Sequence, residues 1–178
     1  FLHASTYKGM GSFRSWIFET SDEFHKSLSE LIQVFNKITS ADLLIRHREI
    51  GEMSINTYKD LIDDKNQNIY IKTDQDNPFI EDLDSADVVI ANFSTTIEEA
   101  VTRGKYAILW GEGNRYSHEN SPYISQDLVF SAHSTEELYN IVELLIKKIE
   151  KEKSNIKNVN SDLKDSQKEF INRIVLRQ

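Results

Sequence analysis

The chain has 178 residues, no cysteine and a formal net charge of −8. The lack of cysteine excludes disulfides, thiolate metal sites and thiol catalysis. The chain has no run of about 18 apolar residues, which a transmembrane helix would need. The negative charge argues against a general nucleic-acid-binding protein, which would carry a basic face, but a nucleotide ligand needs only a few local cations. The length and the hydrophobic content of 39% fit one globular domain with a sizeable core.

Short apolar segments alternate with amphipathic ones along the whole chain. In chain order, strands are expected at Phe1–Ser5, Ala41–Ile45, Asn68–Lys72, Asp87–Ala91, Tyr106–Trp110 and Asp127–Ser131. Helices are expected from the Thr20–Glu23 capping pattern to Ile38, at Tyr58–Ile62, at Phe79–Asp84, from the Ser94–Thr96 turn to Gly104, from the Ser134–Glu137 capping pattern to Ile149, and over Leu163–Ile174. The polar segment Ser154–Asp162 is predicted to be a linker or an exposed turn.

This alternation is typical of a parallel sheet covered on both faces by helices. The fold class that it predicts is α/β, with a doubly wound, parallel, six-stranded, Rossmann-like sheet in the order 3-2-1-4-5-6. The switch point of that order falls between strands one and four, and ligands of open α/β sheets bind at the carboxyl edge there.

A turn rich in hydroxyl groups follows the fourth strand. Ser94, Thr95 and Thr96 stand where the next helix begins, and Gly104 stands where a left-handed residue would end it. Unpaired N–H groups, the helix dipole and the hydroxyls together suit such a turn to hold a phosphate. The alternative is a plain helix cap, although capping needs only one of the three hydroxyls.

Cationic side chains end the second strand. Arg46, His47 and Arg48 follow its apolar residues and are candidates to hold a phosphate, because arginine binds phosphate oxygens bidentately. The alternative is a solvated, charged turn that pairs with Glu49 and Glu52.

Two loops at the same predicted edge hold further candidates. Lys8 lies in the loop after the first strand beside Gly9 and Gly11, which would let the backbone approach a phosphate. Arg115 and His118 lie in the loop after the fifth strand, where they would contact the sugar, the acceptor or a phosphate. Both loops also fit an ordinary surface role.

The segment Ala86–Trp110 resembles the nucleotide-binding half of GT-B glycosyltransferases and of their relatives, the UDP-sugar 2-epimerases and the glycerol-phosphate transferases of surface polymers. The counterparts of the family's motifs are Ala86-Asp87, Ser94-Thr95-Thr96, Glu99-Ala100 and Gly104-Lys105, with Tyr106 where the family usually has proline. The resemblance implies that the Ser94–Thr96 turn holds a diphosphate and that Glu99 accepts hydrogen bonds from the ribose. It also implies that Phe79 lies near the base, with a core or boundary role for Phe79 as the alternative.

The function that the resemblance implies is the donor nucleotide-sugar-binding domain of a GT-B glycosyltransferase in surface or capsular polysaccharide biosynthesis. Its partner would be a UDP-, CDP- or similar sugar. Ala91 stands where retaining enzymes of this fold often have a second glutamate, which favours an inverting or phosphotransfer mechanism. The alternatives are half of a UDP-sugar 2-epimerase and a non-catalytic nucleotide-binding or scaffold domain.

We expect residues 1–178 to form a single Rossmann-like domain, the carboxy-terminal half of a longer two-domain enzyme. The acceptor would bind to the missing amino-terminal domain, so the isolated domain is expected to bind nucleotide with little or no turnover. We expect no metal, no other cofactor and no nucleic-acid partner. The expected location is the cytoplasm, with peripheral association of the full protein at the inner face of the membrane as a further possibility.

Overall fold

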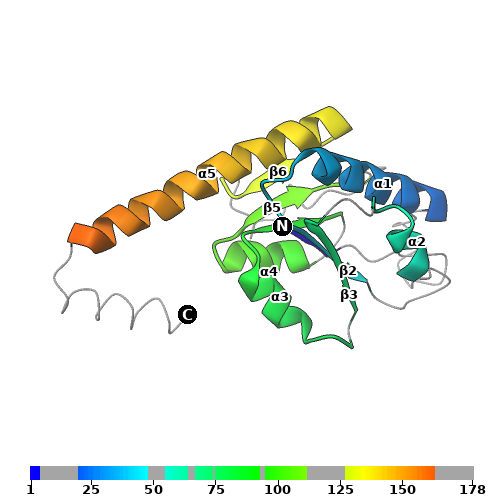
Figure 1. Ribbon diagram of the computed structural model, residues 1–178, viewed down its shortest axis with the longest axis horizontal. Helices are drawn as coiled ribbons and strands as arrows, with labels where there is room; N and C mark the ends of the chain where they lie inside the picture. Colours follow the sequence, from blue (N-terminus) through cyan, green and yellow to red (C-terminus); the bar gives the residue numbers. More distant parts are fainter. Residues whose placement is uncertain are drawn as a thin grey trace. The chain divides into compact units, whose positions relative to one another are not determined.

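A computed structural model of the chain describes residues 1–4, 20–47, 55–63, 67–73, 75–92, 95–111 and 127–162. Within them, six parallel strands form one open sheet in the order β3-β2-β1-β4-β5-β6 (Figure 1). The strands are β1 (Leu2–His3), β2 (Leu43–His47), β3 (Ile69–Thr73), β4 (Val88–Ala91), β5 (Tyr106–Leu109) and β6 (Val129–Ser131). The helices are α1 (Ser21–Lys37), α2 (Ile55–Lys59), α3 (Phe79–Ser85), α4 (Thr96–Thr102) and α5 (Thr135–Asp162).

This arrangement confirms the predicted Rossmann-like fold and its strand order. The six predicted strands are present, with ends that differ from the prediction by at most two residues. The short helix expected at Tyr58–Ile62 begins earlier, at Ile55, and ends at Lys59.

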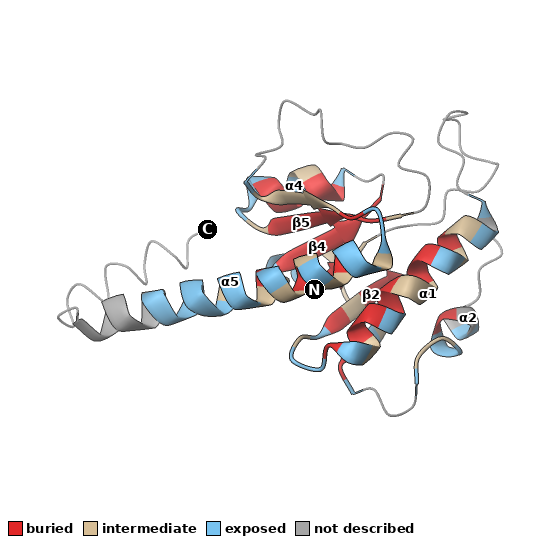
Figure 2. Ribbon diagram, turned by 90° about the horizontal axis from the view of Figure 1, so that it is seen from above, coloured by how far each residue is buried: buried red, intermediate tan, exposed pale blue. Residues whose placement is uncertain are grey.

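Helices cover both faces of the sheet, and alternation along the strands decides which side chain meets which helix. Val89 of β4 packs in one core cluster with Leu83 of α3 and Ile97 of α4. On the opposite face, the indole Nε1 of Trp110 donates a hydrogen bond to the Ser27 carbonyl of α1 at 2.8 Å. Because both faces are covered, β4 and β5 are buried along their whole length (Figure 2), which explains their uninterrupted apolar sequences.

The capping patterns act as the sequence predicts. At the start of α1, the Glu23 N–H donates to Thr20 Oγ1 at 3.1 Å and the Thr20 N–H donates to the Glu23 carboxylate at 2.8 Å, which completes a capping box. At the start of α5, the Glu137 N–H donates to Ser134 Oγ, while the Glu137 carboxylate accepts from the His133 N–H.

The last described helix is longer than predicted. Residues Ser154–Asp162 continue α5 and are not the predicted linker or turn. No glycine or proline interrupts Thr135–Asp162, and lysine and glutamate, which are good helix formers, are frequent in its middle. The chain divides into two compact units, Phe1–Glu143 and Leu144–Gln178. The final helix predicted over Leu163–Ile174 lies outside the described residues. None of the described helices is both long and apolar enough to cross a membrane.

Gly104 ends α4 with a φ of +69°, as predicted from its position. No heavy atom lies within 4 Å of the place where a Cβ would stand, so conformation alone should govern the effect of a substitution. Gly104→Ala should lower the free energy of unfolding by about 1 kcal/mol, and Gly104→Asn should cost less, because asparagine tolerates the left-handed region. Urea titrations followed by circular dichroism would measure both changes, and equal losses would contradict this explanation.

Candidate functional site at the carboxyl edge of the sheet

The strand order places a topological switch point between β1 and β4. Strand β1 pairs in parallel with β2 on one side and with β4 on the other, so the connections diverge at this point. Polar side chains are buried here and at the neighbouring strand ends. The buried polar residues of this edge are His3, Arg46, His47, Asn92 and Thr96. Buried polar groups are unusual enough to mark this edge as the candidate site.

Arg46 and His47 do not form one cationic cluster, because successive residues of a strand point to opposite faces. The ring of His47 lies 4.7 Å from the ring of Tyr58 in α2. Arg46 points the other way and contacts Asp82 in α3. Arg48, the third predicted cation, lies outside the described residues.

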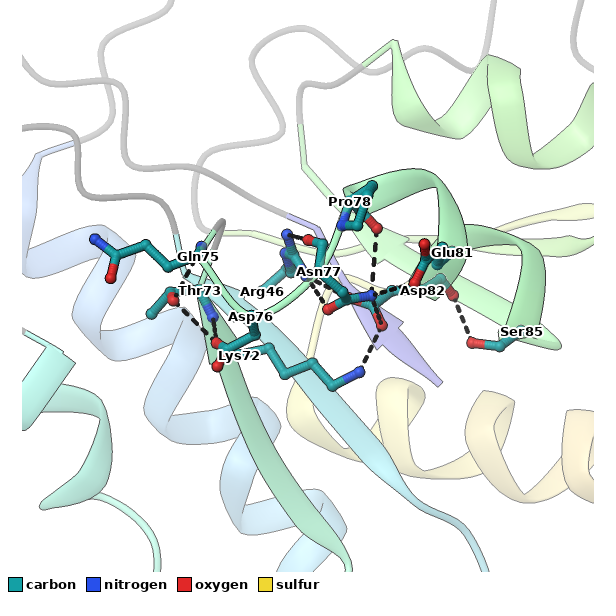
Figure 3. Close-up of polar contacts among 10 residues, drawn as sticks. All are labelled: Arg46, Lys72, Thr73, Gln75, Asp76, Asn77, Pro78, Glu81, Asp82 and Ser85. Atoms are coloured by element: carbon teal, nitrogen blue, oxygen red, sulfur yellow. Dashed lines mark hydrogen bonds and ion pairs between the residues drawn. The ribbon is translucent and has the colours of Figure 1, made fainter.

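The guanidinium of Arg46 is held by two residues of the β3–α3 region (Figure 3). Nη1 donates to Asp82 Oδ2 at 2.5 Å and to Asn77 Oδ1 at 2.8 Å, and Nη2 donates to the Asn77 carbonyl at 2.6 Å. The other oxygen of Asp82 accepts from Lys72 Nζ at 2.8 Å and from Asn77 Nδ2 at 3.0 Å. Four side chains therefore form one polar cluster between β2, β3 and α3, in which Arg46 and Asp82 are buried and Lys72 and Asn77 are partly exposed.

This cluster decides one of the alternatives for Arg46. The side chains of Arg46 and Asp82 are each 3% exposed, so the interpretation of Arg46 as part of a solvated turn is wrong. A phosphate role for Arg46 stays a prediction. Burial acts to raise the pKa of Asp82, but the hydrogen bonds from Lys72 and Asn77 and the charges of Lys72 and Arg46 outweigh it, so the pKa lies below its usual value.

Sequence reasoning missed Asp82 and Asn77. One signal for Asp82 was present, because Phe79, Asp82 and Leu83 share a helical face by their spacing. An acidic residue on an apolar face needs a buried cation as its partner. The sequence does not indicate that this partner lies in β2.

Two aromatic rings and two imidazoles form a row on the face of the sheet that α1 covers. The His3 ring is 6.5 Å from Phe24, and Phe24 is 6.5 Å from Tyr58, which contacts His47. Burial lowers the pKa of His3 to about 4 and raises the pKa of Tyr58 to about 12. His3 is therefore neutral at pH 7, and its Nδ1 has no hydrogen-bond partner among the described residues.

Asn92 follows β4 and packs directly on the backbone of Gly111, which follows β5. A Cβ at Gly111 would lie within 2.8 Å of Asn92 Cβ and closer still to the Asn92 amide group. Only glycine therefore fits at position 111 while Asn92 keeps this position. The contact joins the residues that follow two neighbouring strands next to the switch point.

The other predicted site residues lie in different environments. Thr95 is exposed and its side chain makes no capping hydrogen bond, Thr96 is buried, and Glu99 is exposed in the first turn of α4. Phe79 is partly buried against the core cluster of the α3 and α4 face, which favours its core or boundary role. The predicted site residues outside the described part of the chain are Lys8, Arg48, Ser94, Arg115 and His118.

Lys105, part of the Gly104-Lys105 motif, has a structural role at the opposite edge. Its Nζ donates to the carbonyls of Asp84 and Ala86 at 2.7 and 2.6 Å, at the end of α3. Burial of the amine lowers the pKa of Lys105. A cation is favourable at a helix carboxyl end, so this lysine joins α3 to the start of β5.

The fold and the buried polar edge define the chain as a Rossmann-like α/β protein with a candidate ligand site at its switch point. No family model, curated protein or solved structure matches the chain. Among the described residues, no group of three or more histidine, aspartate or glutamate side chains is placed to hold a metal ion.

Replacing Asp82 should destabilise the protein through the buried charge of Arg46. Asp82→Asn should lower the free energy of unfolding by about 3 kcal/mol, because it leaves a buried cation without its counter-charge. The matched control is Asp84→Asn in the same helix, whose ion pair with Arg103 is exposed and should be worth less than about 1 kcal/mol. Urea titrations at pH 7 would measure both, and equal losses would contradict the role of burial.

The pH dependence of stability should show the burial of His3. The unfolded chain takes up a proton near the ordinary pKa of 6.5, whereas folded His3 resists protonation down to about 4. Stability is therefore full above pH 6.5 and falls as the pH drops, by about 2 kcal/mol between pH 7.5 and pH 5. His3→Gln should remove this slope, and His133→Gln, which replaces an exposed histidine, should keep it. Urea titrations across this range would test it, and an unchanged slope in His3→Gln would refute the assignment.

Proposed function

We propose that this chain is the donor-nucleotide-binding domain of a GT-B-type glycosyltransferase. The observation that carries the proposal is the switch point between β1 and β4 of an open parallel sheet, because ligands of such sheets bind at the carboxyl edge beside it. The resemblance of Ala86–Trp110 to the nucleotide-binding half of these enzymes supplies the ligand class, a nucleoside diphosphate sugar with UDP, CDP or a similar nucleotide. The cellular role that follows is surface or capsular polysaccharide biosynthesis at the cytoplasmic side of the membrane.

Two features of α4 support the proposal. The hydroxyl of Thr95 is exposed and is not used to cap the helix, so it is available as a donor beside the switch point. The Glu99 side chain is exposed one turn later on the same helix. A diphosphate at the start of α4 and a ribose on Glu99 therefore lie in the order that a nucleoside diphosphate requires.

The proposed chemistry needs stabilisation of the diphosphate leaving group when the glycosidic bond breaks. The start of α4 would contribute N–H donors and about 0.3–2 kcal/mol from its dipole. Lys8, Arg115 and His118, which the sequence places in loops at the same edge, would supply the positive charge. The acceptor and the general base would come from an amino-terminal domain, so this chain would bind the donor and leave most of the turnover to the two domains together.

Calorimetric titration with UDP, CDP, GDP and CMP would test the proposal. One nucleotide should bind, and Glu99→Ala should raise its Kd by about tenfold through loss of charged hydrogen bonds to the ribose. The matched control is Glu136→Ala, which removes an exposed glutamate from the first turn of α5 and should leave the Kd unchanged.

This titration, together with assays of sugar isomerisation and glycosyl transfer, separates the competing functions. Absence of nucleotide binding would contradict the proposal and favour a scaffold domain. Isomerisation of a UDP-sugar by the two-domain protein would favour a 2-epimerase. Robust glycosyl transfer by residues 1–178 alone would contradict the two-domain assignment of the acceptor and the general base.

A further inference from the structure

Strand β3 forms an open edge of the sheet. It stands at one end of the strand order, and among the described strands only β2 pairs with it. The Leu43 N–H of β2 donates to the Asn68 carbonyl at 2.8 Å. Main-chain groups of successive strand residues point to alternate sides in the plane of the sheet, so Asn68 and Tyr70 face β2. The N–H and C=O groups of Ile69 and Ile71 therefore face outward.

This edge has few of the features that keep a strand from pairing with another chain. Proteins protect open edges with proline, bulges or charged side chains. Strand β3 contains no proline, and its register with β2 runs through five consecutive pairs without a bulge. Its one charged residue, Lys72, is held by Asp82 at 2.8 Å (Figure 3). A neighbouring strand would therefore not bury an unpaired charge.

Tyr70 lies between the two isoleucines that face outward. Its side chain is 48% exposed, and tyrosine is enriched both in strands and at protein interfaces. One exposed aromatic side chain is ordinary by itself. Its position between two residues with outward main-chain groups is what indicates an interaction surface for another strand.

We propose that β3 is a dimerisation strand, which pairs in antiparallel with β3 of a second copy of this chain about a two-fold axis at Tyr70. In this register Ile69 lies opposite Ile71 of the second copy, and the two residues exchange both main-chain hydrogen bonds. Two-fold symmetry repeats this pair on the other side of the axis, so the outward groups of both isoleucines are satisfied. The sheets of the two copies then join into one continuous sheet.

The register follows from the groups that are already bound or charged. A two-fold axis at Ile71 would require the Thr73 N–H, which donates to Asp76 Oδ2 at 2.5 Å within the chain. An axis at Lys72 would place two like charges opposite each other, which is unfavourable. With the axis at Tyr70, the two tyrosines form a pair without main-chain hydrogen bonds, the kind in which side chains come closest.

This dimer is independent of the proposed function. Strand β3 lies at one end of the sheet, whereas the switch point lies between β1 and β4. A contact through one strand of five residues buries less area than most stable dimers do. We therefore expect a dimer that dissociates on dilution.

Cross-linking through Tyr70→Cys tests the register. The chain has no cysteine of its own, so each copy of the variant carries a single thiol. In the proposed pair the two Cα atoms at position 70 lie about 4.5 Å apart, within the range that a disulfide spans. The matched control is Ile80→Cys, at an exposed position of α3. With a mild oxidant, Tyr70→Cys should form the disulfide-linked dimer at least about tenfold faster than the control.

Sedimentation velocity of the 178-residue chain over a concentration series would measure the dimer itself. We expect a monomer–dimer equilibrium in the parent chain. Tyr70→Glu should raise the dimer Kd by about tenfold or more, because it removes the aromatic pair and places two carboxylates opposite each other. Ile80→Glu introduces the same charge on α3 and should leave the Kd unchanged. Urea titrations would show that each variant is folded.

Three results would overturn the inference. They are a parent chain that stays monomeric throughout the series, equal cross-linking rates at positions 70 and 80, and a dimer whose Kd is unchanged in folded Tyr70→Glu. Each of them would leave the proposed function in place, because nucleotide binding is measured separately.

Discussion

The parallel pairing of β1 with both β2 and β4 is the constraint on which the rest of the structure depends. Parallel neighbours require crossover connections, and the helices of these connections cover both faces of the sheet. The strands are then apolar on both sides, and polar residues remain at their ends. Because all six strands run in the same direction, the polar residues at their carboxyl ends lie at one edge, on both sides of β1. The location of the candidate site thus follows from strand direction, whereas the chemistry of its side chains decides which ligand binds there.

Two buried ionisable groups at this edge keep different charge states, although burial disfavours the charged form of both. His3 lies beside the ring of Phe24 on the α1 face, and desolvation by burial keeps its imidazole neutral at pH 7. Asp82 is equally inaccessible on the α3 face, but Arg46, Lys72 and Asn77 satisfy both of its oxygens, and its charged form persists. A buried charge is tolerated only with such complete pairing. The edge therefore has an uncharged side and a charged side, although both sides are equally buried.

Much of the fold could be predicted from the sequence, because it depends on local patterns. Apolar runs such as Asp87–Ala91 predict strands, Thr20 predicts the start of a helix, and Gly104 predicts an end. The site was less predictable. The pairing of Arg46 with Asp82 and Asn77 joins residues more than thirty positions apart, and only the tertiary structure brings them together. The polar composition of Ser154–Asp162 predicted a turn, but composition does not break a helix that lacks glycine and proline.

The two-residue period of a strand also limits how a run of cations should be interpreted. Arg46 and His47 are adjacent in sequence, yet the sheet separates their side chains, and Arg46 is already balanced by Asp82. With Lys72 included, the Arg46–Asp82 cluster carries one net positive charge, and neutral His3 adds none. The described residues of this edge therefore supply little positive charge beyond what Asp82 already balances. In the proposed function, a diphosphate would be held there mainly by N–H and hydroxyl donors at the start of α4, with positive charge from the adjoining loops. The affinity of such a site for a diphosphate would depend on the positions of its N–H and hydroxyl donors more than on the number of cations along the chain.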